Sequence, residues 1–174
     1  MFLIRRKIRA SQDLAAYARE SFAGETPLLA GARDLTKRIF KDFKFDPKAT
    51  TVATPLEEVW EKRRGVCQDF CASWHCVPAL ARPAPPGMSA ATYGRIRRRG
   101  KSRLIGADAS HAWFSIFCPG TGWVDFDPTN NVQPSEEHIT VAHGRDFGRC
   151  QSGGRNSHRR RPHIVKVAVD VEQV

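Results

Sequence analysis

The fold of this chain is indicated most directly by residues 112–126, which read AWFSIFCPGTGWVDF. Two aromatic-rich runs, 112–117 and 123–126, flank a segment that contains one proline and two glycines. This pattern is typical of two antiparallel strands joined by a short turn. We therefore predict a β-hairpin here, a further strand around 139–142, and a last strand over 165–171, where valines alternate with other residues.

The first half of the chain has helical rather than alternating periodicity. The ranges expected to be helical are 11–24, 27–43 and 54–65. We expect Ser11 and Thr26 to cap the first two helices, and Thr54 with Glu57 to form a capping box on the third. Helices followed by antiparallel strands predict an α+β fold, with the N-terminal helices packed on the sheet. A length of 174 residues is suited to a single domain, 1–174.

The positive charge is concentrated in two segments. The chain carries 28 Lys and Arg against 18 Asp and Glu, a net charge of +10. Residues 70–107 hold seven of these bases and residues 147–163 hold five, with no acid in either segment. Few aromatic residues lie among these lysines and arginines, so we expect only non-specific contact with nucleic acid. Since no apolar run approaches the ~20 residues of a membrane helix, and five cysteines lack regular spacing, we expect a protein of the reducing cytoplasm.

Three residues form a candidate catalytic set. Gly65 ends one expected helix, so Cys67 would stand in the first turn of the next, where exposed N–H groups favour a thiolate. His111 and Asp127 are equidistant from position 119 in the predicted turn, and we expect them to face each other across the two strands. An imidazole beside the thiol completes its activation, and a carboxylate behind the imidazole fixes the tautomer.

Other residues of the hairpin bear on this set. Trp113 and Trp123 are expected on the same side as the imidazole, where they could cover it from water. Asp127 precedes 128–130, a turn sequence, so it could also cap the end of the strand as an Asx-type turn residue. Asp125 is the alternative carboxylate if the pairing register differs by two residues.

Three sequence blocks around these residues resemble the bacterial transglutaminase-like proteins of the papain-like cysteine hydrolase superfamily. The blocks are RGVCQDF (64–70), GADASHAW (106–113) and GWVDFDPTNN (122–131), and they follow the order of that family. Gly144-Arg145-Asp146 also looks like the family. The best-matching core is 54–147.

The resemblance implies a function and a role for each residue. Cys67 would be the nucleophile, His111 the general base and Asp127 the residue that orients the base. The family attacks peptide or glutamine amides through a thioester and passes the acyl group to water or an amine. It implies a protein or peptide substrate and no metal or organic cofactor. The backbone N–H of Cys67 is the expected oxyanion donor.

Two segments depart from the family, and by this resemblance we expect the chain to be truncated at its N-terminus. Residues 71–103 and 149–163 are rich in proline, arginine and glycine, and we expect them to be irregular. A shifted reading frame over 71–99 and 149–163 is one explanation of their composition. If 71–99 does not support the helix behind Cys67, the thiol would not be held close to His111.

Three alternatives stay open. One is a catalytically inactive transglutaminase-like interaction domain. Another is a basic nucleic-acid-binding protein that binds phosphates through the arginines at 97–99 and 159–161. The last is a zinc site built from residues at helical spacing, namely Cys67, Cys71, His75 and Cys76.

Overall fold

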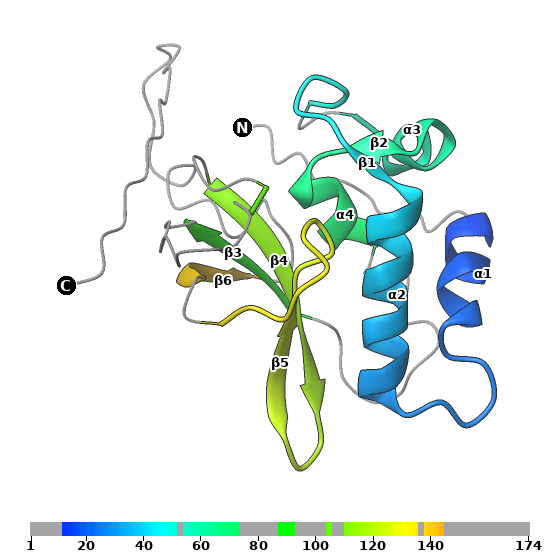
Figure 1. The fold of residues 1–174 in the computed structure, drawn as a ribbon, viewed down its shortest axis with the longest axis vertical. Coiled ribbons are helices and arrows are strands. Elements are labelled where there is room, and N and C mark those ends of the chain that lie inside the picture. The colour runs from blue at the N-terminus through cyan, green and yellow to red at the C-terminus, as the bar shows by residue number, and fades with distance from the viewer. Residues whose placement is uncertain are drawn as a thin grey trace, which may run out of the picture.

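The computed structural model describes residues 12–51, 54–73, 87–92, 104–105, 110–135 and 138–144. The helices are α1 (Gln12–Glu20), α2 (Leu28–Asp42), α3 (Leu56–Lys62) and α4 (Cys67–Ser73). The strands are β1 (Lys44–Phe45), β2 (Arg64–Gly65), β3 (Gly87–Thr92), β4 (Ser110–Cys118), β5 (Gly122–Phe126) and β6 (Ile139–Gly144). The helices gather on one side of the larger sheet, and α4 lies beside β4 (Figure 1). The predicted α+β fold is confirmed.

The helices pack through the apolar stripes that their periodicity predicts. Leu14 and Ala18 of α1 are buried, and Leu35 and Ile39 of α2 are 1% and 2% exposed. Val59 of α3 joins the same core. Full burial of each such aliphatic side chain stabilises the fold by about 1.5–3 kcal/mol, which outweighs the modest helix propensity of these short segments.

The expected helix caps are wrong at two positions. Thr26 does not cap α2; its hydroxyl donates to a carbonyl of the preceding turn at 2.6 Å. Thr54 forms no capping box, because its hydroxyl accepts the Thr51 N–H at 2.9 Å. Pro27 and Pro55 instead stand at the N-cap positions, without a side-chain cap. In both cases the threonine hydroxyl therefore bonds within the turn that precedes the proline, and not to the N-terminus of the helix as predicted.

The connection from α3 to α4 also differs from expectation. The α3 helix ends at Lys62, and Arg63 follows in the left-handed conformation with φ 51°. Gly65 does not end the helix but pairs in parallel with Phe45, so that β2 joins β1 in a two-stranded sheet. The chain then enters α4 directly at Cys67.

The larger sheet has the strand order β5-β4-β3-β6, with every pair antiparallel. The predicted hairpin is formed by β4 and β5, which pair Phe114 with Phe126 and Cys118 with Gly122. The turn is therefore centred on Gly120, one residue beyond the predicted centre. A one-residue shift of the turn centre moves every cross-strand partner by two residues and keeps each side chain on its predicted face.

The expectation of irregular structure over 71–103 is wrong in part. Residues 71–73 complete α4, and Gly87–Thr92 form β3, the strand between β4 and β6. This six-residue stretch holds no proline, and two flanking strands supply partners for its backbone. The expected segment 149–163 and the expected strand 165–171 lie outside the described residues.

The packing of α2 against the turn after α1 predicts the effect of Gly31→Ala. A Cβ atom at Gly31 would lie 2.4 Å from Phe22 Cδ1 and 2.8 Å from the backbone oxygen of Ser21. In an open helix this change stabilises by about 0.5–1 kcal/mol, but here we expect the free energy of unfolding to fall by about 1–3 kcal/mol. Urea denaturation measures it, with exposed Ala30→Gly as the control for helix propensity. An unchanged or increased free energy of unfolding in Gly31→Ala would contradict this packing.

Candidate active site

Cys67 is the first residue of α4 and is 4% exposed. Its Sγ lies 3.3 Å from Oε1 of Gln68. The first N–H groups of a helix have no carbonyl partner within the helix, and the Cys67 N–H is one of these groups. One turn later, the Sγ–H of Cys71 donates to the carbonyl of Ala112 at 3.1 Å, which fixes α4 against β4.

A buried carboxylate that sequence reasoning missed holds the entry to α4. Asp69 is 1% exposed, and its Oδ2 accepts the backbone N–H of Val66 at 3.0 Å and the hydroxyl of Thr50 at 2.6 Å. The same Oδ2 would lie 2.9 Å from a Cβ at Gly65, so a side chain there would meet this carboxylate. Asp69 thus fixes the residues that lead into Cys67. Its position two residues after the cysteine, in the first turn of a helix, is the signal that could have found it.

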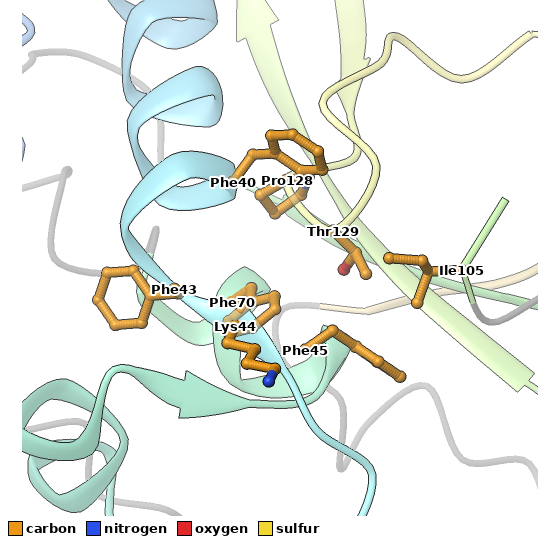
Figure 2. A pocket seen from close by; sticks show the side chains of 8 residues that line it. All are labelled: Phe40, Phe43, Lys44, Phe45, Phe70, Ile105, Pro128 and Thr129. Atoms are coloured by element: carbon orange, nitrogen blue, oxygen red, sulfur yellow. The ribbon is translucent and has the colours of Figure 1, made fainter.

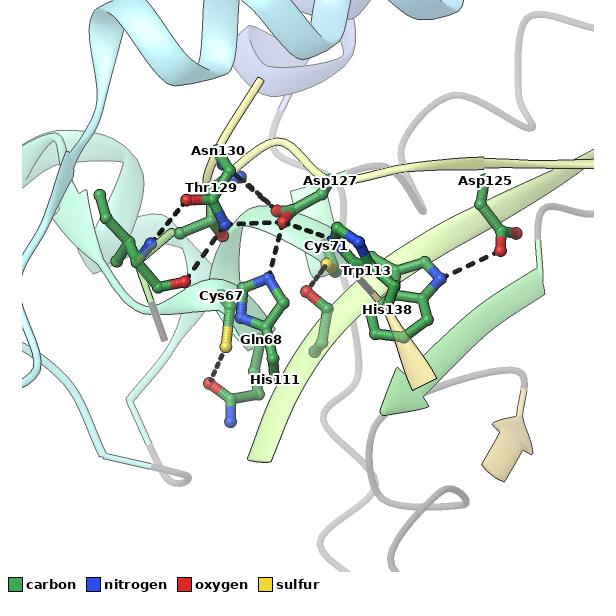
Figure 3. A network of polar contacts seen from close by, with 12 residues as sticks. Cys67, Gln68, Cys71, His111, Trp113, Asp125, Asp127, Thr129, Asn130 and His138 are labelled. Carbon is green, nitrogen blue, oxygen red and sulfur yellow. Dashed lines mark hydrogen bonds and ion pairs between the residues drawn. The ribbon is translucent and has the colours of Figure 1, made fainter. Parts of the chain in front are cut away.

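His111 and Asp127 lie together as the sequence predicted, although not directly across the hairpin. Both side chains are completely buried, and His111 Nε2 lies 2.9 Å from Asp127 Oδ2. In the observed register Asp127 follows β5, so the imidazole reaches the carboxylate diagonally. Figure 3 shows the other ring nitrogen, Nδ1, turned toward the sulfur of Cys67. The structure therefore brings Cys67, His111 and Asp127 to one place.

The Asp127 carboxylate accepts hydrogen bonds at both oxygens. Oδ1 accepts the backbone N–H groups of Thr129 at 2.9 Å and of Asn130 at 3.3 Å. Oδ2 accepts the Asn130 side-chain amide at 2.7 Å in addition to His111, and the Nε2 atom of His138 lies 3.5 Å away. Asp127 is thus both an Asx-type turn residue and the partner of the imidazole. Burial alone would raise the pKa of Asp127, but the hydrogen bonds from His111 and His138 outweigh it and hold that pKa well below its usual range.

The charges in the site favour an imidazolium. Burial disfavours the charged ring, but the hydrogen bond with Asp127 and the neighbouring sulfur of Cys67 outweigh it and raise the pKa of His111 to about 10. A carboxylate can only accept, so Nε2 carries a proton toward Asp127 and Nδ1 is left to take the proton of the thiol. A thiol, an imidazole and a carboxylate in this order can perform nucleophilic attack on a carbonyl.

The roles expected for the neighbouring residues need correction. Asp125 is not an alternative partner of the imidazole: it accepts the Trp113 Nε1–H at 3.2 Å and a hydrogen bond from the Ser115 hydroxyl. Trp113 is completely buried, with its ring centroid 6.3 Å from that of His111. Trp123 is 60% exposed and does not cover the imidazole, because it packs edge-on against Phe117 near the hairpin turn.

Sequence reasoning also missed His138. Its side chain is 3% exposed, and its ring packs edge-on against Trp113 with centroids 5.1 Å apart. It stands directly before β6, eleven residues after Asp127, and contacts the same oxygen as His111. A histidine directly before a predicted strand is a weak signal, and only the three-dimensional structure places it at the carboxylate.

The other candidate sites fall partly or wholly outside the described residues. His75 and Cys76 of the predicted zinc row are among the residues not described, and Cys71 points to the backbone of β4. Within the described ranges, no group of three or more His, Cys, Asp or Glu side chains is arranged to hold a metal ion. The segments 97–99 and 159–161 also lie outside the described residues. Among the helices that are described, none is both long and apolar enough to cross a membrane.

The buried pair predicts how stability depends on pH. The pKa of His111 is raised from 6.5 to about 10, so the stabilising contribution of the imidazolium is complete below pH 6.5 and is lost as pH rises through 10. We expect the free energy of unfolding to fall over this range by on the order of 3 kcal/mol, and to fall less in Asp127→Asn. Urea denaturation at several pH values measures this. Asp125→Asn is the matched control, and an equal slope in wild type and Asp127→Asn would refute the pairing.

The contact between His138 and Asp127 predicts that His138 positions the carboxylate. His138→Phe keeps a ring against Trp113 but removes the donor, whereas His138→Gln keeps an N–H donor in the place of Nε2. We expect Phe to slow alkylation of Cys67 by iodoacetamide about five- to tenfold near neutral pH, and Gln to remain close to wild type. Mass spectrometry gives the rates and thermal unfolding reports the fold. His143→Phe, at an exposed position of β6, is the control. Equal rates in the Phe and Gln variants would rule out a role for the donor.

Known proteins resemble this chain over most of its length. It is 33% identical over 178 aligned positions to uncharacterized proteins of Mycobacterium tuberculosis H37Rv and Mycobacterium bovis, a match that covers 89% of this chain and 51% of each relative. The chain thus spans about half the length of the curated relatives it matches. A crystal structure from Cytophaga hutchinsonii, of a protein provisionally named a cysteine protease, superposes with a TM-score of 0.57 at 21% identity. That match covers 77% of this chain and 42% of the other, and it shows a shared fold.

The family follows from the match over the helices and the hairpin. The family model described as the transglutaminase-like superfamily matches residues 15–128, which run from α1 through the catalytic candidates Cys67, His111 and Asp127. This range is well over half of the chain, and the shared fold of the neighbouring structure agrees with it. The chain belongs to the transglutaminase-like superfamily, as its sequence blocks predicted.

Proposed function

We propose that this chain is a cysteine hydrolase or acyltransferase that acts on peptide or glutamine amides through Cys67, His111 and Asp127. The observation that carries the proposal is the buried 2.9 Å contact between His111 and Asp127, with the second imidazole nitrogen turned toward the sulfur of Cys67 (Figure 3). A thiol at the start of a helix, paired with an imidazole that a carboxylate orients, is the arrangement that covalent acyl transfer requires.

The first half of the reaction forms a thioester. His111 takes the thiol proton at Nδ1, and the thiolate sulfur of Cys67 bonds to the amide carbon. The carbonyl oxygen gains the negative charge and accepts a hydrogen bond from the backbone N–H of Cys67. As the C–N bond breaks, His111 returns the proton to the departing amine. Asp127 stays ionised throughout and keeps Nε2 protonated.

The second half releases the acyl group. Water, or an acceptor amine, gives a proton to His111 Nδ1 and attacks the thioester carbon. The C–S bond breaks and the sulfur of Cys67 leaves as the thiolate, which the imidazolium stabilises. We favour hydrolysis over transfer to an amine, because water needs no binding pocket of its own whereas an acceptor amine does. The alternative within the same family is an inactive interaction domain.

The proposed nucleophile is tested by the reactivity of individual cysteines. Near neutral pH we expect iodoacetamide to alkylate Cys67 at least about tenfold faster than Cys118, because Nδ1 of His111 is turned toward the Cys67 sulfur and can take the thiol proton. Mass spectrometry of the native protein resolves the cysteines, and Cys118, which is partly exposed on β4, is the internal control.

Two variants complete this test. Cys67→Ser should abolish amide hydrolysis, and His111→Gln should reduce the alkylation of Cys67 to the rate of Cys118. The proposal fails if Cys67 and Cys118 react alike over the whole pH range in the wild-type protein, or if amide hydrolysis survives Cys67→Ser.

A further inference from the structure

A cavity of about 280 Å³ lies where the helical part of the molecule meets the sheet (Figure 2). Its lining residues come from α2, β1, α4 and the loops beside β4 and β5, namely Phe40, Phe43, Lys44, Phe45, Phe70, Ile105, Pro128 and Thr129. Cys67 of the helical part meets His111 and Asp127 of the sheet part along the same junction. The cavity and the catalytic candidates therefore lie at one junction between the helices and the sheet, where Thr129 contacts Asp127.

One hydroxyl of the cavity lining, that of Thr129, has no hydrogen-bond partner among the described residues. Thr129 is 2% exposed, and its Oγ1 makes no hydrogen bond to any described residue. Figure 2 shows this oxygen among the apolar side chains that line the cavity. A buried hydroxyl without a partner is costly, and a ligand that brings a hydroxyl of its own removes that cost.

The cavity is joined to the catalytic residues by short connections. The Thr129 N–H donates to Asp127 Oδ1 at 2.9 Å. Asn130, which also donates to Asp127, holds Ile105 through two backbone contacts of 2.7 and 3.2 Å. Phe70 lies in α4 one turn after Cys67. The walls of the cavity are therefore fixed by the same residues that fix the catalytic carboxylate.

We propose that this cavity binds the side chain of a tyrosine in the peptide acyl donor. The inference rests on the proposed function and names its substrate class. The volume is below the ~300 Å³ at which pockets for whole ligands begin, which suits one side chain. Four phenylalanines suit an aromatic ring, and Thr129 Oγ1 suits the phenol hydroxyl. No acidic side chain lines the cavity among the described residues, and Lys44 lies at its exposed edge.

The binding test uses p-cresol and toluene, which differ by the hydroxyl alone. Chemical-shift titration of the wild-type protein should show p-cresol binding about tenfold more tightly than toluene, with shifts at the amides of 43–45 and 129. Thr129→Val should remove this preference, Thr129→Ser should keep it, and Thr121→Val in the exposed hairpin turn should not change it. Equal affinity for the two probes, shifts elsewhere, or a preference that survives in Thr129→Val would each overturn the inference. If Thr129→Val does not fold, the wild-type affinities and the position of the shifts decide the question.

The activity test compares fluorogenic peptides that are identical except for one Tyr, Phe or Ala. We expect kcat/KM to be about tenfold higher for the Tyr peptide than for the Phe peptide, and this ratio to approach one in Thr129→Val. No preference for Tyr at any peptide position would overturn the inference. The two failures are distinguishable: equal alkylation of Cys67 and Cys118 refutes the proposed function, whereas a reactive Cys67 with no preference for p-cresol refutes only the tyrosine site.

Discussion

The buried contact between Asp127 and His111 is the constraint on which the rest of the site depends. An ionised carboxylate without exposure to water costs several kcal/mol unless donors surround it. Here the donors come from β4, from residues 129–130 and from His138 before β6. Segments distant along the chain are thus drawn to one carboxylate, which must remain ionised. The conformation of the loop after β5 and the entry to β6 follow from this requirement.

The position of Cys67, the proposed nucleophile, depends on the packing of α4 against β4. Cys67 and Cys71 are four residues apart and so lie on one face of the helix. Cys71 contacts the carbonyl of Ala112, and Cys67 faces His111, the preceding residue of the same strand. A single helix–strand contact therefore places both the thiol and the imidazole, and Asp69 fixes the residues that lead into α4. Small changes in this contact would change the distance between sulfur and imidazole, to which the rate of a nucleophilic reaction is sensitive.

Periodicity predicted the helices, the hairpin and the meeting of His111 with Asp127, because buried faces must be apolar and paired strands must alternate. Details that depend on competing hydrogen bonds could not be predicted. Thr54 bonds to its own turn rather than to α3, and the centre of the hairpin lies at Gly120, which its φ of +82° suits. The two-residue change in register did not separate the pair, since an even shift keeps both side chains on one face. His138 reaches Asp127 only through the path of the chain after β5, which local sequence does not encode.

The inactive interaction domain remains the main alternative within this superfamily, and the polar groups of the site bear on it. A domain that only binds a partner gains nothing from a buried ion pair, since apolar residues of similar volume are often as stable or more stable. Burying two histidines and an asparagine around one carboxylate costs desolvation free energy that apolar packing would avoid. The same groups suit the proposed role of His111, in which the imidazole gains and loses a proton. The Thr129 hydroxyl has no hydrogen-bond partner among the described residues, so its burial also costs free energy unless a ligand bonds to it. Both features lie at the junction between the helices and the sheet, the place where we propose that a substrate binds.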